Sequence, residues 1–156
     1  MDYQNFKNWR GSRSLFADSF TILYQMKTPP FRSWTKEAAQ KVAERLSLPF
    51  DDSMQDWPIE VVNPNDIDTY LEQYSSAGNS DEKFVLMEMI IQSLEEHPDE
   101  SRLESNWDAV RTILIDNFEI HQFTIYYWAD LKGGRNCDQW KMSDKLRQVW
   151  QSVVGN

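Results

Sequence analysis

The fold is decided by residues 79–94, which read NSDEKFVLMEMIIQSL. Asn79, followed three residues later by Glu82, forms the pattern of a capping box, with which helices begin. The apolar residues that follow cover more than one face of a helix: Phe84, Leu86, Met87, Ile90, Ile91 and Leu94. A helix that is apolar on several faces is typical of a buried position, so we expect this segment in the centre of the core, ending before Pro98.

Other stretches on both sides repeat apolar residues at the spacing of a helix. Residues 1–26 indicate one or two helices that end at Pro29 and Pro30, which cannot donate a backbone hydrogen bond. The remaining stretches, each with its expected N-cap, are 38–46 after Ser33 or Thr35, 67–74 after Asn65, 107–114 after Ser105 and 146–153 after Ser143.

Two segments are ambiguous. Residues 50–64 contain two prolines, which favour an extended segment or a lone strand. Residues 123–128 have high strand propensity, but the spacing of the apolar residues in 118–131 also fits a helix, which we favour. The expected fold class is therefore all-α, a compact multi-helix domain with antiparallel helix pairs over residues 1–156. The alternative is an α+β fold with one short strand or hairpin near 59–62 or 123–128.

From residue 81 to residue 153 the chain alternates helices and short loops. In this it resembles stacked helix-pair proteins of the HEAT-like kind. The resemblance covers about half of the chain and has no diagnostic motif or fixed repeat period. It implies antiparallel helix pairs and says nothing of function.

Composition excludes several classes of protein. Of the 156 residues 40% are apolar, too many for a disordered chain. Cys137 is the only cysteine and cannot form an internal disulfide, which indicates a reducing compartment. The first residues lack the basic segment and apolar run of a signal peptide, and no apolar run approaches the roughly 20 residues that span a bilayer. We therefore expect a cytoplasmic protein with no membrane partner.

The negative charge is concentrated in the middle of the chain. The net charge is −9, yet residues 49–120 carry three Lys or Arg against eighteen Asp or Glu. Such a segment repels phosphate groups and disfavours binding of nucleic acid. It favours a basic protein partner, or serves only solubility.

No motif for catalysis or for a cofactor is visible. Cys137 with His121, or His121 with Glu119 and Asp130, are the first suspects for an unfamiliar active site. The acidic run at 95–100 could bind a divalent cation weakly, but a solvated helix end explains it better. The Gly-rich run at 133–135 lacks the spacing of a phosphate-binding loop and indicates a turn. We expect no metal and no cofactor.

The features that remain are acidic and aromatic. Three adjacent aromatics at 126–128 cannot all face one core, so at least one should lie at the surface, whereas Trp107, Trp140 and Trp150 are expected in or beside the core. Aromatic side chains exposed among charges are typical of binding hot spots. The candidate partner surface consists of Asp51, Asp52, Asp56, Trp57, Glu60, Asp66, Tyr126 and Trp128.

These features favour a non-catalytic protein-binding domain for a basic protein partner. In size, charge and lack of catalytic motifs the chain resembles the small acidic immunity proteins that bacteria use against their own toxins, which implies an immunity- or antitoxin-like inhibitor. One alternative is an adaptor or regulatory subunit of a larger complex. The other is an enzyme with an unrecognised site around His121 or Cys137.

Overall fold

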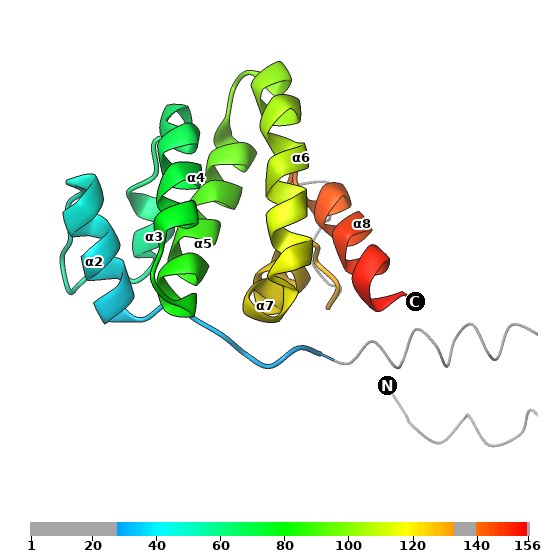
Figure 1. Ribbon diagram of the computed structural model, residues 1–156, viewed down its shortest axis with the longest axis horizontal. Coiled ribbons are helices and arrows are strands. Elements are labelled where there is room, and N and C mark those ends of the chain that lie inside the picture. The colour runs from blue at the N-terminus through cyan, green and yellow to red at the C-terminus, as the bar shows by residue number, and fades with distance from the viewer. Residues whose placement is uncertain (1–27, 133–139, 156) are drawn as a thin grey trace, which may run out of the picture.

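A computed structural model describes residues 28–132 and 140–155 of the chain. These residues form seven α-helices, one 3-10 helix and no strand (Figure 1). The expected all-α fold class is confirmed. The helices are α2 (Lys36–Leu46), α3 (Trp57–Glu60), the 3-10 helix η1 (Pro64–Asp66), α4 (Ile67–Ser76), α5 (Ser80–Glu96), α6 (Glu100–Asp116), α7 (Phe118–Trp128) and α8 (Ser143–Val154). The helices expected in 1–26 and the turn expected at 133–135 lie outside the described residues.

Helix α5 is the centre of the packing. Its N-cap is Asn79, whose side-chain oxygen accepts hydrogen bonds from the backbone N–H groups of Asp81 and Glu82, as the capping pattern predicts. Helices α2, α3 and α4 pack against it, and so does α7. From Phe84 to Leu94 only Glu88 is not fully buried. The burial follows from apolar residues on several faces of the helix.

The remaining helices complete the core on the other side of α5. The chain reverses direction between α5 and α6 through a short connection (Figure 1). Helix α6 packs against α7 and α8, and α8 packs against α7. Trp107 and Trp150 are buried and Trp140 packs against the core, as the sequence predicts.

Both ambiguous segments contain helix and no strand. The preference for a helix at 118–131 is confirmed by α7, so the alternative strand at 123–128 does not form. The extended segment expected within 50–64 is wrong, because residues 57–60 form the short helix α3 and 64–66 form η1. A proline lies in the first turn of each, where its missing N–H leaves no helical bond unmade.

The predicted caps are right in part. Thr35 caps α2 and Asn79 caps α5. Helix α6 begins earlier than expected, because Asp99 rather than Ser105 provides its N-cap. Ser143 lies inside α8 rather than before it, and its hydroxyl donates to the backbone carbonyl of Trp128 at 2.8 Å. This bond ties the start of α8 to the end of α7.

Glu95 joins the end of α5 to the start of α8. Its two carboxylate oxygens accept hydrogen bonds from the backbone N–H groups of Lys141 and Met142, each at 3.0 Å. The ammonium of Lys141 donates to the carbonyl of His97 at 2.8 Å. A carboxylate at the N-terminus of a helix is favoured by the helix dipole and satisfies N–H groups that have no helical partner. Glu95 thus has a structural role, whereas Glu96, Pro98, Asp99 and Glu100 are exposed at the helix end, as expected.

Among the described residues, no helix is both long enough and apolar enough to cross a membrane.

We expect Glu95→Gln to lower the free energy of unfolding by about 1–3 kcal/mol, because the amide offers one accepting oxygen where the carboxylate offers two. Urea denaturation followed by circular dichroism measures the loss. Glu96→Gln is the matched control, since Glu96 is exposed and accepts from the side chain of Gln92, a bond that glutamine preserves. Equal stability of the two variants would show that the link between α5 and α8 contributes little.

Candidate functional site

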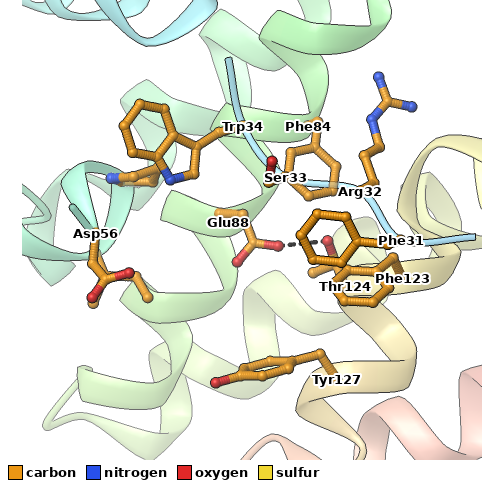
Figure 2. A pocket seen from close by; sticks show the side chains of 12 residues that line it. Phe31, Arg32, Ser33, Trp34, Asp56, Phe84, Glu88, Phe123, Thr124 and Tyr127 are labelled. Carbon is orange, nitrogen blue, oxygen red and sulfur yellow. Dashed lines mark hydrogen bonds between the residues drawn. The ribbon is translucent and has the colours of Figure 1, made fainter. Parts of the chain in front are cut away.

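A pocket of about 200 Å³ opens between α5, α7, α3 and the segment that precedes α2 (Figure 2). Four large apolar side chains of the described residues are exposed, and three of them, Phe31, Ile59 and Tyr127, line this pocket. The volume is below the roughly 300–1,000 Å³ of typical small-molecule sites, so the pocket suits a group of the size of one side chain. We call it the Glu88 pocket; its lining is Phe31, Arg32, Ser33, Trp34, Asp56, Pro58, Ile59, Phe84, Glu88, Phe123, Thr124 and Tyr127.

Helical spacing places two pairs of lining residues, each pair on one face of a helix. On α5, Phe84 and Glu88 are four residues apart and therefore lie on one face of the helix. On α7, Phe123 and Tyr127 are also four residues apart. The ring of Phe123 packs edge-on against that of Phe31 with centroids 5.0 Å apart, which holds the segment before α2 against α7.

Glu88 is the polar group at the base of the pocket. Its Oε1 accepts a hydrogen bond from the hydroxyl of Thr124 at 2.5 Å, and its Oε2 accepts from the indole N–H of Trp128 at 3.4 Å. Both donors come from consecutive turns of α7. Burial raises the pKa of Glu88, and the two hydrogen bonds oppose that rise. The folded protein thus holds a carboxylate where its charged form is disfavoured.

The rim of the pocket carries a second carboxylate. Figure 2 shows Asp56 on the side of Trp34, across the pocket from Phe31. Glu60 is close to it, because its Oε1 accepts from the backbone N–H of Asp56 at 3.1 Å. The pocket therefore presents acidic groups at its base and at its rim.

One cation lies in the lining, but it is engaged elsewhere. The guanidinium of Arg32 donates to Asp81 at 2.8 Å and lies 5.2 Å from the ring centroid of Phe84. In Figure 2 its side chain extends away from Glu88. Among the described residues, the carboxylate of Glu88 therefore has no paired cation.

Two of the aromatic residues expected at a partner surface are buried. Trp57 is 0% exposed and its indole N–H donates to the carbonyl of Pro49 at 2.7 Å. Trp128 is 4% exposed and donates to Glu88. The expectation that they are exposed is wrong, because each indole N–H has a partner inside the fold. The exposed member of the 126–128 aromatic run is Tyr127.

The remaining predicted residues lie at different distances from the pocket. Asp56 lines it and Glu60 is bonded to Asp56. Asp51 and Asp52 are exposed in the turn before α3, where Asp51 accepts from Ser53 and Asp52 pairs with Lys36 at 2.6 Å. Two do not line it: Asp66 is exposed in η1, and Tyr126 is half-buried against Trp150. That these residues bind a partner stays a prediction.

Sequence reasoning missed Glu88 and its aromatic surroundings. A signal was present, since Glu88 is the one acidic residue inside the apolar run of residues 84–91. Its hydrogen-bond donors on α7 are 36 and 40 residues further along the chain, a distance over which periodicity carries no information.

His121, the first suspect for catalysis, lies in the core and does not line the Glu88 pocket. Its Nε2 shares a hydrogen bond of 2.7 Å with the hydroxyl of Tyr74. Burial, together with the positive charges of Arg32 and Lys83, lowers the pKa of His121 to about 3, and burial raises the pKa of Tyr74 to about 12. Both groups are neutral near pH 7. Cys137, the other suspect, lies outside the described residues.

The acidic run at 95–100 is divided among structural tasks. Glu95 binds the start of α8, and Asp99 caps α6. His97 is buried, and its Nδ1 accepts from the backbone N–H of Asp99 at 3.1 Å. Over residues 28–132 and 140–155, no three His, Cys, Asp or Glu side chains are grouped so that they could hold a metal ion.

Comparison with known proteins gave no match: no family model, no curated protein and no solved structure is similar to the chain.

We expect Glu88→Gln to become more stable relative to the wild type as the pH rises, as measured by the difference in their unfolding free energies. The folded pKa of Glu88 is raised, so its contribution to stability is present below the unfolded value near 4.5 and is lost as the pH rises through the folded value. Between the two values the difference changes by about 1.4 kcal/mol per pH unit. Urea denaturation at several pH values measures it, and a difference independent of pH would mean that the fold does not disfavour the charged form of Glu88.

We expect His121→Gln to reduce the acid sensitivity of the fold. The folded pKa of His121, about 3, is below its ordinary value of 6.5, so the unfolded chain binds the extra proton between these values and the wild type loses stability as the pH falls below 6.5. The advantage of the wild type over the variant should shrink by about 1.4 kcal/mol per pH unit in that range. Tyr74→Phe, which retains the buried imidazole, should retain the trend, and a constant difference for His121→Gln would contradict this account.

Proposed function

We propose that this chain is a non-catalytic protein-binding domain that holds a basic protein partner at the Glu88 pocket and at the carboxylates beside it. The observation that carries the proposal is the clustering of exposed aromatic and aliphatic side chains around one pocket with two acidic groups. Exposed apolar patches rimmed by polar residues are typical of protein–protein contacts. An immunity- or antitoxin-like inhibitor acting in the cytoplasm is one function of this kind.

The charges beside the pocket favour a basic partner. Asp56 and Glu60 lie at its rim, with Asp51 and Asp52 in the preceding turn of chain. Lys36, which pairs with Asp52, is the one basic side chain bonded to this group among the described residues. The uncompensated charge would accelerate encounter with a positively charged surface and reject an acidic one.

Retention of Glu88 in a largely apolar environment also favours a binding role. A carboxylate whose charged form is disfavoured by burial reduces stability at neutral pH. Buried groups of this kind with shifted pKa values concentrate at functional sites. An incoming positive charge would remove the penalty, so the pocket is better matched to a bound state than to a free one.

Reversal of rim charges tests the proposal. We expect Asp52→Lys, Asp56→Lys and Glu60→Lys in one triple variant to weaken binding of a peptide with three glycine-spaced arginines about tenfold at low salt, because three surface ion pairs at roughly 0.5 kcal/mol each are lost. Isothermal titration calorimetry at several salt concentrations measures the affinity, whose salt dependence should also flatten.

The matched control changes the net charge equally on another surface. It is the triple variant Glu96→Lys, Asp108→Lys and Asp116→Lys, whose sites are exposed on α5 and α6 and do not line the pocket. We expect it to weaken binding of the peptide less than the rim variant does. An equal loss in both variants would mean that only net charge matters, and the docking role would be rejected.

A further inference from the structure

The chemistry of the Glu88 pocket selects among possible occupants. A neutral apolar group would leave the carboxylate of Glu88 enclosed without a charge partner, and an anion would be repelled by both Glu88 and Asp56. A cation with aromatic rings around it would gain from both the rings and the carboxylate. Figure 2 shows this arrangement, with Trp34 on one side of Glu88, Phe123 on the other and Tyr127 below.

The shape of the acidic group favours a guanidinium over an ammonium. Each oxygen of Glu88 accepts one hydrogen bond, from Thr124 or from Trp128, and each retains a lone pair for a second donor. A guanidinium can donate to both oxygens at once and stack on an aromatic face, and it is less strongly hydrated than an ammonium. Arg32 already places a guanidinium on the ring of Phe84 beside this pocket.

We infer that the Glu88 pocket receives the side chain of an arginine of the basic partner, with its guanidinium paired to Glu88 and flanked by Trp34 and Tyr127. The inference rests on the proposed function and names its anchor. The volume of about 200 Å³ is suited to one such side chain. The arginine would be enclosed by apolar walls, and the solvent-exposed carboxylates of the rim would surround it. Binding hot spots occur in arrangements of this kind.

Titration of the full chain with N-acetyl-arginine methylamide tests the inference, and the citrulline analogue, which has the same shape without the charge, is the matched probe. We expect the arginine probe to bind with an affinity on the order of millimolar and to shift the NMR signal of the indole N–H of Trp128, which is bonded to Glu88. The citrulline probe should leave that signal unchanged.

Glu88→Gln should weaken binding of the arginine probe at least about tenfold, which corresponds to the loss of one charge-assisted hydrogen-bonded pair. Tyr127→Leu, which removes an aromatic wall and keeps the carboxylate, should weaken it less. Glu96→Gln removes an exposed charge on α5 outside both the pocket and its rim and should have little effect. The NMR spectrum of each variant reports whether it is folded.

Several results would overturn the inference. They are equal binding of the arginine and citrulline probes, no shift of the Trp128 signal at tens of millimolar probe, and self-association of the chain that disappears in Glu88→Gln. Arginine binding that survives Glu88→Gln and maps to residues 51–56 would also overturn it while leaving the proposed function intact. Binding in the pocket combined with equal losses in the two triple lysine variants would instead reject the acidic docking surface.

Discussion

Enclosure of α5 is the constraint on which the rest of the structure depends. Helices α2, α3, α4 and α7 all pack against it, so any side chain that it buries must be apolar or must find a hydrogen-bond partner. Three acidic residues of α5, Glu82, Glu88 and Glu95, meet this condition in different ways.

Glu82 and Glu95 stabilise the two ends of the central helix. Glu82 is bonded to Arg45 of α2 at 2.7 Å and to the side chain of Asn79 at 3.0 Å, which secures the start of α5. Glu95 binds the backbone that leads into α8. Glu88, between them, is bonded to α7 and also lines a pocket. Because its carboxylate lines this pocket, it can meet a bound group, and the proposed function therefore depends on it.

Local sequence signals predicted the fold class and the central helix. The caps Thr35 and Asn79 and the apolar faces of α5 and α7 needed only spacing and side-chain type. The short helices α3 and η1 were not predicted, because Pro58 and Pro64 are equally compatible with an extended segment and with the first turn of a helix. The exposure of Trp57 was misjudged for a related reason: its hydrogen bond to Pro49 depends on a tertiary turn that no periodic pattern records. The partnership of Glu88 with Thr124 and Trp128 required the packing of α5 against α7.

The base and the entrance of the Glu88 pocket differ in how tightly they are tied to the core. Glu88 and Thr124 are held by long helices, whereas Phe31, Asp56 and Ile59 are exposed at its edge. Substitutions at exposed positions usually change the free energy of unfolding by less than about 0.5 kcal/mol. Substitutions at the entrance can therefore alter the shape and charge of the pocket at little cost in stability, while the helical body and the carboxylate of Glu88 stay as they are.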